Sequence, residues 1–152
     1  MNSGVAARAA GLLGIVAIIA GSFLPWAVSG GIGRNSYQLA GLAGRIGLLD
    51  GPAGTAVAAW PWLGPVCILP VLAGCLRWWR TAAGLAVLCG LASGGVAALA
   101  LIEVGTKERF GVALATTGPV TMLVGGALAV IAGVLVLVLG RRQRVPPAGT
   151  RR

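Results

Sequence analysis

Four apolar stretches alternate with polar segments along the chain, and none of the four contains a charged residue. They cover about residues 9–28, 55–76, 81–102 and 119–139. About 20 consecutive apolar residues are enough for a helix to span a hydrocarbon core about 30 Å thick. The pattern therefore predicts an all-α integral membrane bundle of four transmembrane helices, which forms a single domain over residues 1–140.

Tryptophans stand near the ends of these stretches, where an amphipathic ring is expected at the membrane–water interface. Trp62 and Trp78 are 16 residues apart, which is about 24 Å along a helix and matches two aromatic belts. The first stretch continues past a passable signal-peptidase site at Ala20-Gly21-Ser22 and stops at Trp26, so we expect it to be retained as a span. The predicted interface anchors are Trp26, Trp60, Trp62, Trp78 and Trp79.

The first outer loop, residues 29–54, begins with the flexible-looking sequence "SGGIGR" and then predicts a short amphipathic helix. Asn35 and Gln38 have the spacing of a capping box, with Asn35 as the N-cap. Four apolar residues at helical spacing share one face of this helix: Leu39, Leu42, Ile46 and Leu49. Asp50-Gly51-Pro52 ends the segment. We expect this helix on the outer leaflet or over the mouth of the bundle, either as a structured linker or as a lid or docking surface.

The second outer loop, residues 103–118, adds Glu103 and, four residues later, Lys107. This spacing favours an interfacial salt bridge if the helix continues, and a proton or cation site is the alternative. The candidate outer-loop site comprises Arg45, Asp50 and Glu103. Residues 141–152 form a basic, proline-containing tail that we expect to be disordered and attracted to anionic headgroups.

Composition agrees with a membrane protein, and charge gives it an orientation. Of 152 residues, 57% are hydrophobic and only 10% are charged, the mean hydropathy is +0.93, and the net charge is +9. The basic residues adjoin apolar stretches, so orientation explains them better than nucleic-acid binding does. Eight of them flank one side and four the other: Arg8, Arg77, Arg80, Arg141, Arg142, Arg144, Arg151 and Arg152 against Arg34, Arg45, Lys107 and Arg109. The positive-inside rule then places both termini in the cytoplasm.

The sequence offers little catalytic chemistry. It has no histidine, and its three cysteines, Cys67, Cys75 and Cys89, lie within apolar stretches, where we expect reduced, packed thiols rather than disulfides or a metal site. The apolar stretches contain no ionisable residue that would mark an ion path. We therefore expect no catalytic residues, no metal and no cofactor.

Small residues recur every fourth position in the third stretch and again in the fourth. Such ridges let helices approach closely in lipid. The simpler interpretation is that the two spans pack together within one chain, and the alternative is that the third also packs on another subunit. The candidate packing or partner-interface residues are Ala86, Gly90, Gly94, Gly125 and Gly133. Pro70, midway along the second stretch, predicts a kink.

The chain resembles small four-span membrane proteins of actinobacteria in "GSFLPW" at the end of its first span, a glycine-rich outer loop, "RWWR" at the central turn and "GPV" with a later "GG" in its fourth span. Leu24-Pro25-Trp26 is the most specific part. The resemblance implies a bacterial plasma membrane and supplies no active residues.

Two functional hypotheses follow. The first is a non-catalytic accessory or scaffold subunit of a plasma-membrane complex, whose partners are membrane lipids and another membrane protein or a second copy. The alternative is a small oligomeric transporter or channel for a lipid, an amphipathic solute or an ion. An enzyme acting on lipid ranks third.

Overall fold

The computed structural model describes residues 3–29, 31–45, 55, 58–104 and 112–142. Its elements, in chain order, are α1 (Ser3–Phe23), β1 (Pro25–Ser29), β2 (Ile32–Asn35), α2 (Ser36–Arg45), η1 (Trp60–Trp62), α4 (Leu63–Cys75), α5 (Trp79–Val104), β3 (Val112–Leu114) and α6 (Thr117–Arg142). Three helices are long and apolar enough to cross a membrane, over Gly4–Phe23, Trp79–Ile102 and Thr117–Gly140. The apolar helical segment Trp60–Cys75 is shorter.

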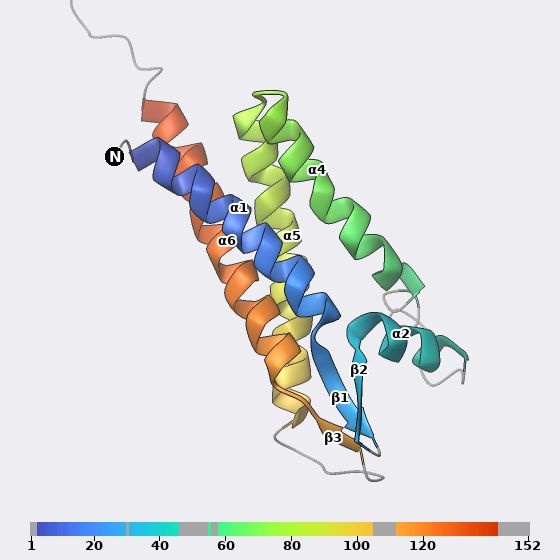
Figure 1. The fold of residues 1–152 in the computed structure, drawn as a ribbon. Helices are drawn as coiled ribbons and strands as arrows, with labels where there is room; N and C mark the ends of the chain where they lie inside the picture. The colour runs from blue at the N-terminus through green and yellow to red at the C-terminus, as the bar shows by residue number, and fades with distance from the viewer. Residues whose placement is uncertain (1–2, 30, 46–54, 56–57, 105–111, 143–152) are drawn as a thin grey trace, which may run out of the picture.

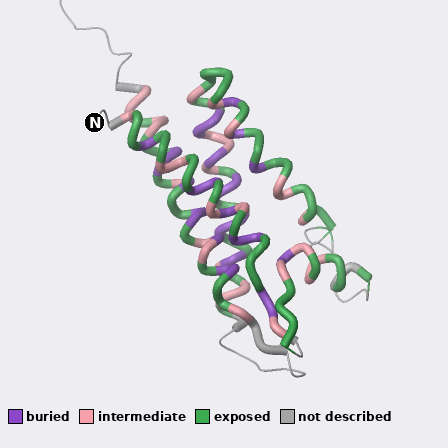
Figure 2. The backbone as a smooth tube through the Cα atoms, in the orientation of Figure 1, coloured by how far each residue is buried: buried purple, intermediate pink, exposed green. Residues whose placement is uncertain are grey.

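The three long helices form the body of the molecule. α6 contacts both α1 and α5 extensively, whereas α4 contacts chiefly α5. α4 lies beside α5 at the turn that joins them and separates from it toward the end near α2 (Figure 1). The most deeply buried side chains include Ile15, Ile18 and Met122, and buried positions concentrate where the long helices face one another (Figure 2). The small sheet and α2 lie together at one end of this body (Figure 1).

The expectation of an all-α fold is wrong in one respect, because the segments between the long helices include a three-stranded antiparallel sheet in the order β2-β1-β3. "SGGIGR", predicted to be flexible, is largely part of a hairpin in which Val28 pairs with Gly33 and Ser29 with Ile32. Gly31 in its turn has φ 81, a conformation that glycine adopts at little cost. β3, which precedes α6, pairs with β1 and so ties the two loops together.

The first span also ends earlier than predicted, at Phe23 rather than at residue 28. Leu24 still donates its backbone N–H to the Ala20 carbonyl at 3.1 Å. Leu24 precedes Pro25, however, and the residue before a proline is disfavoured in the α region. Residues 25–28, the last part of the first apolar stretch, therefore belong to β1.

The second predicted span is less regular than the others. A 3-10 turn over Trp60–Trp62, with Pro61 in its first turn, precedes the 13-residue α4. Together they extend about 25 Å, and Ala58 and Ala59, directly before them, are helical as well. α4 ends with a pair of backbone bonds, from Arg77 N to Gly74 O and from Trp78 N to Ala73 O, that form a Schellman motif. This motif makes the tight turn predicted at "RWWR".

The helix predicted in the first outer loop is α2, and its capping box is confirmed. Gln38 donates its backbone N–H to Asn35 Oδ1 at 3.0 Å, and Asn35 donates its own to Gln38 Oε1 at 3.1 Å. Leu39 packs against the core, while Leu42 is exposed. Ile46 and Leu49 lie outside the described residues. α2 contacts α1, η1 and the sheet at one end of the bundle (Figure 1).

Candidate functional site

The small residues predicted to mediate packing do so within the chain. On α5, a Cβ added at Gly90 would come within 2.7 Å of Gly126 O, and one at Gly94 would lie 3.8 Å from Gly126 Cα. On α6, a Cβ at Gly133 would lie 2.8 Å from Ala83 O. Glycine is required at the closest of these contacts because the two backbones nearly touch. We call this contact the α5–α6 seam.

Gly125 on α6 packs against α1, whereas its spacing predicted a contact with α5. A Cβ there would lie 2.7 Å from Ile18 N and 2.8 Å from Gly14 O, both on α1. A Cβ at Gly21 would likewise lie 2.6 Å from Met122 N. This second contact, the α1–α6 seam, was missed. Its signal in the sequence is the seven-residue spacing of Gly14 and Gly21, two turns along one helix face.

A second feature missed from the sequence joins α4 to α5 around Pro70. Proline has no N–H, so the carbonyl of Val66, four residues earlier, loses its helical donor. The Cys89 thiol on α5 lies 3.9 Å from that carbonyl oxygen and is oriented as its donor. Both Cys89 and Cys67 are buried. A thiol on α5 thus partly satisfies the backbone group that Pro70 leaves without its helical donor.

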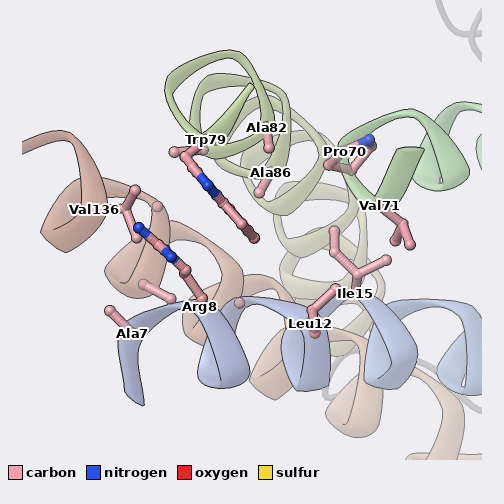
Figure 3. A pocket seen from close by; sticks show the side chains of 14 residues that line it. Ala7, Arg8, Leu12, Ile15, Pro70, Val71, Trp79, Ala82, Ala86 and Val136 are labelled. Carbon is pink, nitrogen blue, oxygen red and sulfur yellow. The ribbon is translucent and has the colours of Figure 1, made fainter. Parts of the chain in front are cut away.

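A pocket of about 60 Å³ lies near the end of the bundle at which α4 turns into α5, and its residues come from all four apolar helices. α1 contributes one continuous helical face to it, from Ala7 to Ile15, and α4 contributes Pro70 and Val71. Ala86, predicted as a packing residue, is on the α5 wall (Figure 3). Arg8 is the one charged residue among the described residues that line this pocket.

Arg8 and Trp79 meet at one end of this pocket. The Arg8 Cζ lies 4.0 Å from the Trp79 ring centroid, and Figure 3 shows the guanidinium and the indole side by side. Such a cation–π contact fixes the orientation of an otherwise mobile side chain. Trp79 was predicted as an interface anchor, and its ring here also forms a wall of the pocket.

The other tryptophans divide into two groups. Trp62 and Trp78, at the two ends of the α4 segment, are 68% and 64% exposed, as interface anchors require. Trp26 is 8% exposed and donates its Nε1–H to Gly21 O at 2.9 Å, while its ring packs edge-to-face on Trp60 at 6.0 Å. β1 thus places the Trp26 ring over the bundle, where Gly21 O of α1 accepts its N–H, and the anchor role of Trp26 stays a prediction.

The candidate outer-loop site is not assembled by the described residues. Arg45 ends α2 and is exposed. Glu103 belongs to the last turn of α5, and Asp50 and Lys107 lie outside the described residues. Within the described part of the chain, there is also no group of three or more His, Cys, Asp or Glu residues that could hold a metal ion. Comparisons with protein-family models, with curated proteins and with solved structures found no match.

Proposed function

We propose that this chain is a non-catalytic accessory subunit of a bacterial plasma-membrane complex, and that α4 presents the surface that binds its partner. The observation that carries the proposal is that α4 is the apolar helix with the smallest contact to the rest of the chain. α1 and α5 each pack extensively on α6, whereas α4 has a much smaller contact, chiefly with α5. A helix so placed has a wide face left for a neighbour.

α4 is apolar and continues from the 3-10 turn η1, over Trp60–Cys75. As a fourth span it would give both termini the cytoplasmic location that the distribution of arginines favours. Its outward face would then meet either lipid or a helix of a partner protein.

The outward face of α4 consists of large apolar side chains at helical spacing. Ile68, Leu69, Leu72 and Leu76 are all exposed, Leu72 by 53%. Gly90 and Gly94 of α5 already face α6, so a partner would pack on these large side chains of α4 rather than on that glycine ridge. Substitution of Gly90, whose added Cβ would lie 2.7 Å from Gly126 O, would consequently disturb the fold of the chain itself.

The polar groups in the described spans favour this function over ion transport. Ser22 and Ser93 are buried, and each donates its hydroxyl to a carbonyl of its own helix at 2.6 Å: Ile19 O and Cys89 O. Hydroxyls engaged in this way offer little to a hydrated ion, which needs a continuous set of oxygen ligands.

Photo-crosslinking in the native membrane tests the proposal. A photoreactive residue at position 72 should give one protein adduct, whereas one at Leu13, which is 65% exposed on α1, should give lipid adducts. The paired variant Leu69→Ala/Leu72→Ala should then shorten the lifetime of the complex on native gels, and the matched variant Leu13→Ala/Leu99→Ala should not. Equal labelling from positions 72 and 13 would refute an α4 interface. An adduct between two copies of the chain would instead support the oligomeric transporter.

A further inference from the structure

The pocket beside α4 has the two chemical parts that an anionic lipid would need. Its interior is apolar, with Leu12, Ile15, Val71 and Val136 among its walls. Arg8, its one charged lining residue in the described chain, lies at the end of the bundle where the candidate spans of α1 and α5 begin, one helical turn from Gly4. Trp79, under the guanidinium, begins the candidate span of α5. Both residues therefore lie at the depth expected of lipid headgroups.

The geometry of Arg8 leaves its hydrogen-bond donors available. The guanidinium carbon lies over the Trp79 ring, and the N–H groups of Arg8 lie in the plane of the guanidinium, around its edge. A fork of such donors matches a phosphate, which it binds through two parallel hydrogen bonds. Because the ring already holds Arg8 in place, less side-chain entropy is lost when a phosphate binds.

Among the described residues, this end of the bundle also carries basic side chains and no acidic one. Arg77 and Arg80 are exposed at the start of α5 beside Trp79. Glu103, the one acidic residue in the described part of the chain, occupies the last turn of the same helix. It is 24 residues from Trp79, or about 36 Å along α5. A negatively charged headgroup would therefore meet an uncompensated basic surface.

We propose that this pocket binds one anionic phospholipid, with the phosphate on the edge of Arg8 and one acyl chain against the wall formed by Leu12, Ile15 and Val71. Basic pockets between spans are a recurrent mode of anionic-lipid recognition. The pocket suits this occupant better than a protein helix, because its volume of about 60 Å³ admits a short run of acyl chain and not a helix about 10 Å wide. Ile15 lies seven residues from Arg8, so the acyl chain would reach about 10 Å below the phosphate.

The test uses the full chain in a neutral detergent, with bound lipid counted by native mass spectrometry after addition of phosphatidylglycerol or phosphatidylcholine with the same acyl chains. We expect the wild-type chain to retain one phosphatidylglycerol in preference to phosphatidylcholine. Arg8→Gln should reduce that preference about tenfold, since it removes charge-assisted hydrogen bonds to the phosphate. The matched variant Arg34→Gln alters an exposed arginine on β2 and should leave the preference unchanged.

A pocket-filling variant tests the acyl-chain half separately. Val71→Phe approaches the pocket from α4, the least tightly packed wall, and should lower retention of phosphatidylglycerol while Arg8 remains. Circular dichroism of each variant checks that the helices are intact. Equal retention of the two lipids by the wild type, an unaltered preference in Arg8→Gln, displacement of the lipid by inorganic phosphate, or full retention in Val71→Phe would each overturn the proposal. The test needs no partner protein, so its failure is distinct from failure of the proposed function.

Discussion

α6 and α4 both pack against α5, yet the two contacts are built differently. In the α5–α6 seam, glycines bring the backbones so close that a Cβ on Gly126 would lie 2.8 Å from Gly90 O. The α4 contact instead buries Cys67 and Pro70 and includes the weak bond from Cys89 to Val66 O. In lipid, burial of apolar side chains gives little advantage, and close backbone packing has to supply the association. The comparison indicates that α6 is held rigidly and that α4 is the more separable helix.

The largest effect should come from one methyl group in the α1–α6 seam. Gly125→Ala would place a Cβ within 2.8 Å of two backbone atoms of α1, neither of which can move aside as a flexible side chain would. We expect a loss of about 2 to 3 kcal/mol in the free energy of unfolding, which is typical of overpacking. Unfolding of the chain in mixed micelles by titration with dodecyl sulfate, followed by circular dichroism, measures it.

Gly95→Ala is the matched control for that experiment. A Cβ at Gly95 would meet no atom within 4 Å, and alanine favours helix over glycine by about 1 kcal/mol. This variant should therefore be as stable as the wild type or slightly more stable. Equal losses for Gly125→Ala and Gly95→Ala would show that close packing in the seam does not stabilise the bundle, and the contrast between α6 and α4 would fail.

Hydropathy alone located the long helices, because an apolar run of 20 or more residues has few alternatives to a membrane helix. The spacing of Gly90, Gly94 and Gly133 likewise predicted packing between the third and fourth spans, and these residues lie in the α5–α6 seam. The sequence also predicted the capping box of α2, because Asn35 and Gln38 are only three residues apart and their two hydrogen bonds depend on local sequence alone.

What sequence reasoning missed depends on partners distant in the chain. β3 is three residues long and pairs with β1 from the other outer loop, so no local alternation marks it. The burial of Trp26 was missed for the same reason, because it depends on that pairing and on Trp60. The pocket was equally hidden, since Arg8 and Trp79 are 71 residues apart and neither is unusual alone.

A smaller effect should come from the contact that ties α4 to α5. Cys89→Ala removes the thiol that faces Val66 O, and we expect it to cost about 0.6 to 1 kcal/mol, as interhelical hydrogen bonds in membranes do. Pro70→Ala restores a backbone N–H to the same carbonyl. In the Pro70→Ala background the cost of Cys89→Ala should therefore fall toward zero, and a double-mutant cycle on unfolding free energies measures the coupling. Additive losses would mean that the thiol acts through packing alone.

The smallest effect should come from the turn between α4 and α5. Arg77 occupies the left-handed position of the Schellman motif, with φ 61, where a non-glycine residue carries about 1 to 2 kcal/mol of strain. Arg77→Gly relieves that strain but gives the unfolded chain more freedom, so we expect a net gain of about 0.5 kcal/mol in the free energy of unfolding.

Arg77→Asn, which tolerates the left-handed region and also removes the charge, separates strain from electrostatics. If Arg77→Gly stabilises the chain and still lowers the preference for phosphatidylglycerol, the arginine is retained at a strained position for its charge. If Arg77→Gly lowers neither the stability of the chain nor its preference for phosphatidylglycerol, the basic surface that attracts the headgroup is confined to the other arginines at this end.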